Sequence, residues 1–360
     1  MRFIPTFCLQ EGMLLGKSIY NKNGSLLLRE GSNIRQQYIS KVIELDIQGL
    51  YVEDELSRGI EVESVINEEL RLNTVEKIKD IFIDIQKESS NLSKNMSMAN
   101  TYVEDMIEEL INNKHVMVNM VDIKSFDEYT YHHSVNVCVL SIIIGISINL
   151  TQEELSSLGM AALLHDIGKV FINQELLNKV APLTVEEFEV MKEHPMNGYK
   201  YMKSTFDFPF QTNLGVLQHH EKYDGTGYPQ NKAGEEIFLF GRIIAIADVY
   251  DALVSNRYYK KALLPSEAME YIMGGAGTHF DFELVNVFIR KVAAYPLGTC
   301  VKLSNGVEGI VVENYPDAST RPKIKLIEKD NKENNKEEHY INLKNDFDNT
   351  NLTIIEIINI

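Results

Sequence analysis

The segment that decides the interpretation of this chain runs from position 163 to 169, with the sequence Leu163-Leu164-His165-Asp166-Ile167-Gly168-Lys169. Leu158, Ala161 and His165 follow helical spacing, so His165 is predicted to face inward. The neighbouring Asp166 projects in another direction, from which its carboxylate could reach a second ion. Neutral imidazole is the commonest protein ligand for transition metals, and a carboxylate can bridge two ions. The pair is therefore a candidate metal site at the end of a buried helix.

Further residues of metal-ligand type recur downstream. Four of the nine histidines lie between positions 165 and 220, because His194 and the adjacent pair His219-His220 follow His165. Asp248 ends an apolar run over 243–247, and a buried carboxylate needs a cation or a strong hydrogen-bond donor. Each histidine taken alone fits a structural or exposed role, but the cluster as a whole indicates a metal site. Two metals held close together are a recurring device for hydrolysing phosphate esters.

The segment 129–134 supplies one more candidate ligand. His133 shares a helix face with Val137, Leu140 and Ile144, and this apolar stripe points it inward. The adjacent His132 lies about 100° further round the helix, so both side chains cannot easily enter one site. We therefore predict that His133 enters the site and that His132 stays at the surface or behind the ligands.

Three basic residues near these positions are candidates for contacts with phosphate. Lys169 lies four residues after His165, where its ammonium could reach the same site, although a solvated lysine at a helix C-terminus is the alternative. Arg257 and Lys260 follow Asp248 by nine and twelve residues. Basic groups beside a metal site are natural phosphate clamps, while a surface role is the simpler interpretation of each one taken alone.

Composition limits the classes of protein to consider. The chain has 360 residues, a net charge of −17 and a pI near 5.0, which argue against non-specific binding to nucleic acid and against attraction to anionic lipid. Cys8, Cys138 and Cys300 are too few and too scattered for a disulfide framework, so a reducing compartment fits. The apolar run 135–148 predicts a buried helix rather than membrane insertion. Without a signal-peptide pattern at the N-terminus, we expect a cytoplasmic protein.

Changes in glycine content and hydrophobic periodicity divide the chain into four segments and predict a mainly α fold. Residues 1–60 form a small α+β module punctuated by glycines, with a helix over 34–45 and a strand over 49–52. Residues 61–113 contain no Gly or Pro and carry two helical apolar stripes, so we interpret them as a helical linker. These stripes most simply pack against the next domain, and a homodimer through 61–113 is the alternative.

Residues 114–294 form a predicted domain that is nearly all helix and contains the candidate metal ligands. Residues 295–360 switch to a β-rich pattern, in which 300–303 and 309–312 flank the turn Asn305-Gly306 as a hairpin. A further strand is predicted over 324–327, and the alternation within 352–360 predicts a last edge strand.

Together these motifs resemble the HD-GYP subfamily of HD-domain phosphohydrolases, which degrade the bacterial second messenger cyclic di-GMP. The resemblance covers residues 125–295 and rests on five segments in the family's order, namely YTYHHS (129–134), LLHDIGK (163–169), EHP (193–195), QHHEKYDGTGYP (218–229) and IADVYDALVSNRYYKKA (246–262). That combination is highly specific, whereas the two-residue pair at 165–166 alone is not. The resemblance implies an all-helical HD-type domain.

The resemblance also implies roles for single residues. Metal ligation falls to seven side chains with Asp166 as the bridge, namely His133, His165, Asp166, His194, His219, His220 and Asp248. The resemblance assigns contacts with phosphate to Lys169, Arg257 and Lys260. As the bridging ligand and the phosphate contact nearest to it in sequence, Asp166 and Lys169 are the residues predicted to be catalytic. The segment Gly227-Tyr228-Pro229 matches the signature loop of the subfamily. Some members bind a third metal through a Glu at the place that Tyr129 occupies here, so two divalent ions, iron or manganese, are expected.

The implied reaction is hydrolysis of cyclic di-GMP to pGpG, and then to GMP, through a hydroxide that bridges the two metals. Two alternatives stay open. One is a phosphodiesterase for another cyclic dinucleotide or nucleotide, because the metal ligands would be identical. The other is a non-catalytic cyclic di-GMP receptor that signals through protein partners, although the presence of all seven expected ligands argues against it.

Overall fold

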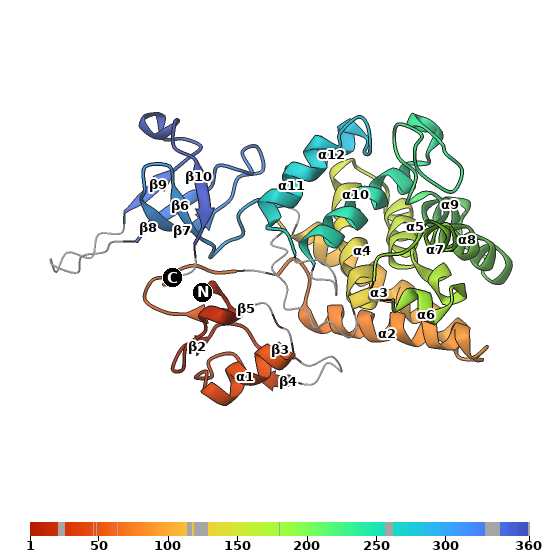
Figure 1. The fold of residues 1–360 in the computed structure, drawn as a ribbon, viewed down its shortest axis with the longest axis horizontal. Coiled ribbons are helices and arrows are strands. Elements are labelled where there is room, and N and C mark those ends of the chain that lie inside the picture. The colour runs from red at the N-terminus through yellow and green to blue at the C-terminus, as the bar shows by residue number, and fades with distance from the viewer. Residues whose placement is uncertain are drawn as a thin grey trace. The chain divides into compact units, whose positions relative to one another are not determined.

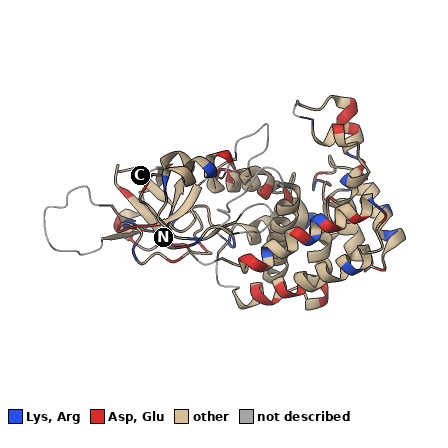
Figure 2. Cartoon of the chain, turned by 90° about the horizontal axis from the view of Figure 1, so that it is seen from below, with Lys and Arg blue, Asp and Glu red and all other residues tan. Residues whose placement is uncertain are grey.

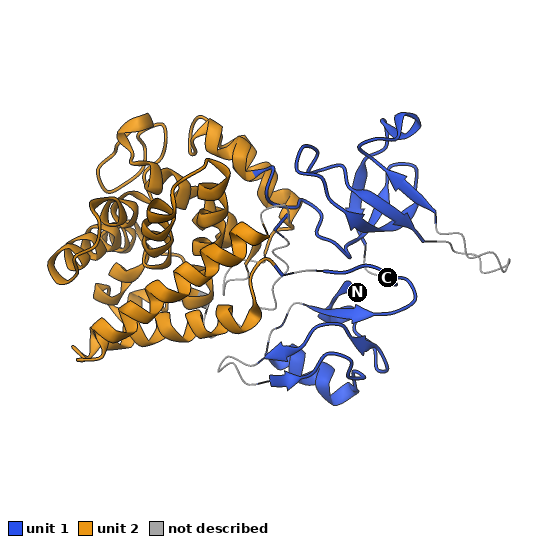
Figure 3. Ribbon diagram, turned by 180° about the vertical axis from the view of Figure 1, so that it is seen from behind, with its two compact units in different colours: residues 1–64, 117–127, 289–360 blue, residues 65–116, 128–288 orange. Residues whose placement is uncertain are grey.

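The computed structural model describes residues 1–20, 26–45, 47, 49–62, 64–113, 117–118, 129–179, 181–255, 262–327 and 339–358. The chain divides into two compact units (Figure 3). Unit 1 comprises residues 1–64, 117–127 and 289–360, and unit 2 comprises residues 65–116 and 128–288. All seven predicted metal ligands belong to unit 2, so that unit is the one that positions the site.

Unit 2 is built from helices in its described residues (Figure 1). They are α2 (Glu68–Gln86), α3 (Leu92–Asn112), α4 (Tyr129–Ser147), α5 (Gln152–Leu163), the 3-10 helix η3 (Ile167–Phe171), α6 (Gln174–Leu177), α7 (Val185–Met191), α8 (His194–Thr205), α9 (Phe210–Gln218), η4 (Gly234–Glu236), α10 (Leu239–Val254), α11 (Pro265–Gly274) and α12 (Phe282–Phe288). The mainly α fold class that the sequence predicts is thereby confirmed.

Helix α4 lies at the centre of unit 2, where it packs against α2, α5, α10 and α12. One described stretch, Thr130–Ser147, is long and apolar enough to cross a membrane, and 72% of it is buried inside the structure. Leu140 and Ile144, on the stripe that the sequence assigns to the core, are 1% and 0% exposed. An apolar helix surrounded in this way supplies the core of the unit and holds His133 in its interior.

The two helices predicted over 61–113 are α2 and α3, which pack against each other and against α4 and α5. Their stripes are buried, with Val75, Ile78, Val103 and Met106 at most 3% exposed. Packing against the neighbouring helices, the simpler of the two interpretations, is therefore confirmed. A homodimer through residues 61–113 stays a prediction, and it would have to use the outer faces of these helices.

The N-terminal part of unit 1 is a small α+β module, as predicted. Its three-stranded antiparallel sheet has the order β1 (Arg2–Pro5), β5 (Gly49–Glu53) and β2 (Leu14–Leu15), and β3 (Ile19–Tyr20) pairs with β4 (Leu26–Leu28). The short 3-10 helix η1 (Thr6–Cys8) follows β1, and α1 (Gln36–Glu44) buries Ile39 and Val42 against this sheet.

The C-terminal part of unit 1 is a five-stranded antiparallel sheet. Its order is β10 (Ile354–Ile357), β6 (Cys300–Leu303), β7 (Glu308–Glu313), β8 (Lys323–Leu326) and β9 (Tyr340–Asn342), and the short 3-10 helix η5 (Phe347–Asn349) precedes β10. The predicted hairpin, the following strand and the last edge strand are confirmed, whereas β9 was not predicted. Tyr51 and Ile60 share a buried cluster with Cys300 and Ile310, so the two ends of the chain contribute to one core.

The charges are spread over the surface of the helices. The chain has 52 acidic and 35 basic residues, and Figure 2 shows both kinds interspersed along unit 2. An anionic substrate would therefore depend on positive charge supplied locally at its binding site.

Candidate metal centre

The seven predicted ligands sit at the ends of helices or on helices that face one another. His165 and Asp166 form the turn between α5 and η3, and His194 is the first residue of α8. His219 and His220 come directly after α9. His133 projects from α4 and Asp248 from α10. Pro195 follows His194 in the first turn of α8, where the missing proline N–H costs nothing.

Gly168 explains how the turn of Asp166 lies so close to α8. A Cβ at this position would overlap the carbonyl oxygen of His194 and come within 2.6 Å of the Gly198 nitrogen. Only glycine therefore permits the backbone of η3 to contact the first turn of α8, which brings Asp166 and His194 together.

We expect Gly168→Ala to separate η3 from α8 and to lower the free energy of unfolding by about 1–3 kcal/mol, the usual cost of overpacking. Chemical denaturation measures the change, and elemental analysis shows whether the variant still binds metal. Gly274→Ala is the matched control, because nothing lies within 4 Å of a Cβ there. A Gly168→Ala protein as stable as wild type would show that the close approach is dispensable.

Four ligands form a first group, in which Asp166, His194, His219 and His220 offer atoms that all lie within 4.8 Å of one another. The Nε2 atom of His194 lies 3.3 Å from Asp166 Oδ1 and 3.3 Å from the Nε2 atom of His219. Three nitrogens and a carboxylate oxygen at this spacing can surround one cation of the transition series.

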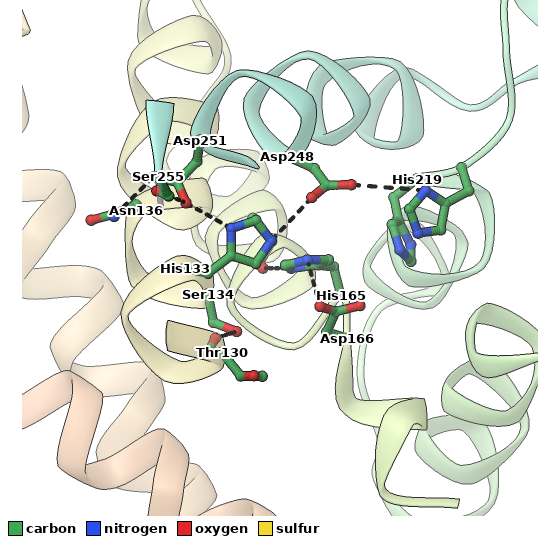
Figure 4. Close-up of polar contacts among 12 residues, drawn as sticks. Thr130, His133, Ser134, Asn136, His165, Asp166, His219, Asp248, Asp251 and Ser255 are labelled. Carbon is green, nitrogen blue, oxygen red and sulfur yellow. Dashed lines mark hydrogen bonds and ion pairs between the residues drawn. The ribbon is translucent and has the colours of Figure 1, made fainter. Parts of the chain in front are cut away.

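The other three ligands form a second group, in which the offered atoms of His133, His165 and Asp248 meet the same 4.8 Å limit. Figure 4 shows the imidazole of His133 between Asp248 and Asp251, with His165 beside Asp166. His133 Nε2 lies 3.0 Å from Asp248 Oδ1, and His165 Nε2 lies 3.4 Å from Asp166 Oδ2. The two oxygens of Asp166 thus face the two groups, as expected of a carboxylate that bridges.

The imidazole rings are held by hydrogen bonds at Nδ1. The Nδ1 atoms of His165, His194 and His219 lie 2.7–2.8 Å from the carbonyl oxygens of Ala162, Met191 and Val216. An Nδ1–H that donates to a carbonyl leaves Nε2 unprotonated and directed into the site. This arrangement is characteristic of histidines that bind metals.

One buried atom tests whether the site fits a metal. His165 is fully buried, and its Nε2 atom makes no hydrogen bond in the described part of the chain, although it lies 3.4 Å from Asp166 Oδ2. A buried nitrogen lone pair without a donor is costly, and a cation is the partner that its surroundings of carboxylates and imidazoles would favour. The donor set therefore fits divalent cations.

The site sets the protonation states of its members. Burial lowers the pKa of His194 to about 3 and of His220 to about 4, and Lys169 adds to both effects. Burial opposes a charge on His133 as well, but hydrogen bonds to Asp248 and Asp251 raise its pKa to about 9. Without metal, the first group of histidines is therefore neutral and the second group holds a proton on His133.

This difference predicts that metal binding depends on pH in the second group and hardly at all in the first. A cation in the second group must displace the His133 proton, so its affinity should rise about tenfold per pH unit from 6.5 to 8.5. A cation in the first group should bind almost equally across that range, because His194 and His220 are already neutral. Calorimetric titration with Mn²⁺ in buffers of different ionisation heat counts the protons, and binding without any proton release would contradict this assignment.

The residues predicted to contact phosphate are only partly described. Lys169 lies at the edge of the site, where its Nζ atom is 2.5 Å from Asp166 Oδ2 and its side chain is 31% exposed. Tyr228 stacks on the ring of His220 with centroids 4.8 Å apart, and Gly227 and Pro229 flank it in the same loop. Arg257 and Lys260 lie outside the described residues.

Two buried acidic residues at the site were not predicted as functional. Asp251, one turn after Asp248, accepts hydrogen bonds from His133 Nδ1 at 2.7 Å and from Asn136 Nδ2 at 2.9 Å. Glu221 accepts from the backbone nitrogens of Gln230 and Lys232, which fixes the loop that carries Tyr228. The available signal in the sequence was their position, since Asp251 lies three residues after Asp248 and Glu221 directly follows His220.

Comparison with known protein families gives two matches in separate parts of the chain. A model of the HD domain matches residues 105–284, and a KOW domain associated with the HD domain matches residues 300–360. The chain belongs to the HD-domain family. The first match contains all seven candidate ligands, and the second coincides with the five-stranded sheet of unit 1.

Several curated relatives in this family carry names that state an activity. A cyclic di-GMP phosphodiesterase of Pseudomonas aeruginosa is 36% identical over 228 residues, which cover 63% of this chain and 55% of the relative. One of Vibrio cholerae is 45% identical over 146 residues, 39% of this chain and 30% of the relative. A 3′3′-cGAMP-specific phosphodiesterase of Vibrio cholerae is 35% identical over 142 residues, 39% of this chain and 27% of the relative. The chain thus spans about half or less of the length of these proteins.

Proposed function

We propose that unit 2 is a phosphodiesterase that hydrolyses cyclic di-GMP with two divalent cations, iron or manganese, as cofactors. The observation that carries the proposal is the pair of adjacent ligand groups, with one oxygen of Asp166 directed toward each. Two neighbouring cations with a bridging carboxylate are typical of phosphate-ester hydrolysis. The names of the relatives from Pseudomonas aeruginosa and Vibrio cholerae support the choice of substrate.

The proposed division of labour assigns His194, His219 and His220 to one cation, His133, His165 and Asp248 to the other, and Asp166 to both. Bound cations would supply Lewis acidity and lower the pKa of a water molecule between them. The protein contributes a preorganised and nearly dry site, since the side chains of His133, His165, Asp166 and His194 are at most 3% exposed. Preorganised charge in such a site is effective because little reorganisation is needed.

We propose that Lys169 donates to a phosphoryl oxygen of the substrate, because its ammonium group lies at the partly open edge of the site next to Asp166. Arg257 and Lys260 are proposed as further phosphate contacts on the basis of the sequence. Positive charge at this edge would hold the phosphodiester against the ligands and stabilise the additional negative charge of the transition state. Attack of a water molecule on phosphorus would form the new P–O bond and break the bond to the 3′ oxygen. That oxygen would take up a proton to give linear pGpG, and a second hydrolysis would give GMP.

Turnover by purified, metal-loaded protein tests the proposal. The full chain is reconstituted with Fe²⁺ or Mn²⁺ under reducing conditions and given cyclic di-GMP, and chromatography follows pGpG and GMP. We expect cleavage that stops when a chelator removes the metal. Binding of cyclic di-GMP without any cleavage by fully loaded protein would instead support a non-catalytic receptor that acts through protein partners.

A second candidate substrate is another cyclic dinucleotide. The relative named as 3′3′-cGAMP-specific is 35% identical, so a relative at a similar distance carries a different substrate name. Competition between cyclic di-GMP and 3′3′-cGAMP in one reaction separates the two. We expect cyclic di-GMP to be consumed faster, and preferential loss of 3′3′-cGAMP would replace it as the substrate.

A further inference from the structure

We propose that a pocket beside the metal centre, walled by Phe188, Lys192 and Tyr228, holds a guanine base of the substrate and selects it over adenine. The inference rests on the proposed function, since it takes the scissile phosphate to lie at the metal ligands. It adds the residues that would recognise the base, which neither the ligands nor the phosphate contacts can do.

The pocket opens next to the most exposed ligand of the metal centre. It has a volume of about 730 Å³ and is lined by α7, the start of α8 and the loop that carries Tyr228. Tyr228 lines the pocket, and its ring stacks on that of His220 with centroids 4.8 Å apart. The side chain of His220 is 25% exposed, against 11% for Asp248 and 1% for His194. Substrate bound at the ligands would therefore extend past His220 into this pocket.

The walls of the pocket suit a flat aromatic ligand. Phe188 faces Tyr228 edge-on, with centroids 6.3 Å apart and an angle of 81° between the rings. Phe188 is 47% exposed, so part of its ring is available to a stacking ligand. A base one ribose away from the phosphate at the ligands could stack on this ring, as bases do on exposed aromatic side chains.

The charges in the pocket favour guanine. The Nζ atom of Lys192 lies 5.5 Å from the ring centroid of Phe188 and 6.0 Å from that of Tyr228, and it pairs with Glu189 at 2.6 Å. Guanine presents the acceptors O6 and N7 to such a lysine, whereas adenine replaces O6 with an amino donor. Glu189 and Glu193 line the same pocket, and their carboxylates complement the N1–H and N2–H donors that guanine has on its adjacent edge.

Ratios of kcat/KM test the inference with wild type, Phe188→Ala and Lys192→Met. The substrates are cyclic di-GMP, cyclic di-AMP and bis(p-nitrophenyl) phosphate, which has no nucleobase. We expect Phe188→Ala to lower the ratio of cyclic di-GMP to bis(p-nitrophenyl) phosphate at least about tenfold, through lost stacking. We expect Lys192→Met to lower the ratio of cyclic di-GMP to cyclic di-AMP at least about tenfold, through lost readout of O6 and N7.

The controls separate base recognition from general damage. Phe210→Ala removes another exposed ring, 65% exposed and outside the pocket. Lys203→Met removes a lysine of α8 that does not line the pocket. Elemental analysis confirms that every variant retains its metal. Unchanged ratios in Phe188→Ala and Lys192→Met, with wild type cleaving cyclic di-GMP, would overturn this inference and leave the proposed function intact. A wild type that cleaves bis(p-nitrophenyl) phosphate but no cyclic dinucleotide would overturn both.

Discussion

Replacing Asp166 with asparagine is expected to remove at least one metal ion per chain and to lower kcat for cyclic di-GMP at least about 100-fold, because even the outer-shell partners of metal ligands contribute 10- to 100-fold. The carboxylate is 2% exposed, and burial alone would raise its pKa. Lys169 and the imidazoles of His165 and His194 instead hold that pKa well below its usual range, so Asp166 is a permanent anion between the two ligand groups. Asparagine keeps the volume and removes this charge.

Elemental analysis and steady-state kinetics measure the two effects on the same preparation. Asp317→Asn is the matched control, because Asp317 pairs with Lys344 at 2.7 Å and its side chain is 68% exposed. An exposed pair contributes little to stability, so this variant should resemble wild type. Full metal content and full turnover in Asp166→Asn would show that Asp166 does not bridge the cations.

The second large effect is expected from Asp251→Ala, which removes the partner of His133 Nδ1. Asp251 is fully buried, and its loss leaves His133 and Asn136 without the hydrogen bonds at 2.7 and 2.9 Å. Asn136 in turn accepts from Arg71 Nη1 at 2.6 Å, so the network extends from α10 through α4 to α2. We expect metal affinity of the second ligand group to fall about 10- to 100-fold and the free energy of unfolding to fall by about 3–5 kcal/mol.

A positioning role for Asp251 differs from a merely structural one in the pH dependence of metal binding. Burial lowers the pKa of His133, and the carboxylates of Asp248 and Asp251 raise it to about 9. Without Asp251 only one carboxylate opposes the effect of burial, so this pKa should fall. The proton release on Mn²⁺ binding at pH 7.5 should decrease accordingly. Asp281→Ala, which breaks the buried pair with Arg242 at 2.6 Å elsewhere in unit 2, should destabilise the protein without this change. Equal proton release in wild type and Asp251→Ala would reduce Asp251 to a structural residue.

Most of the fold followed from local sequence patterns. The stripe of Val137, Leu140 and Ile144 predicted the central helix because period and burial agree there. The turn Asn305-Gly306 predicted the hairpin between β6 and β7, which the structure contains. Gly306 adopts a positive φ of 84° there, which glycine tolerates without strain. Strand β9 was missed because its three residues follow a long charged stretch and are too few to show alternation.

The sequence predicted the metal ligands of the site but not the residues that support them. Histidines are rare enough that His133, His165 and His194 stood out, and the structure places each of them in one of the two ligand groups. The role of Asp251 could not be predicted, because it depends on the packing of α10 against α4 rather than on local sequence. The base pocket was likewise hidden, since Phe188 and Tyr228 are 40 positions apart and meet only in the folded chain.

The central claim is that seven side chains from separate helices and turns hold two cations in unit 2. Elemental analysis of the full chain, reconstituted with Mn²⁺ or Fe²⁺ under reducing conditions and freed of loosely bound metal, tests this most directly. We predict two ions per chain in wild type, with loss of one or both in Asp166→Asn. Wild-type protein that is folded and retains no transition ion under these conditions would contradict the claim and remove the basis of the proposed hydrolysis.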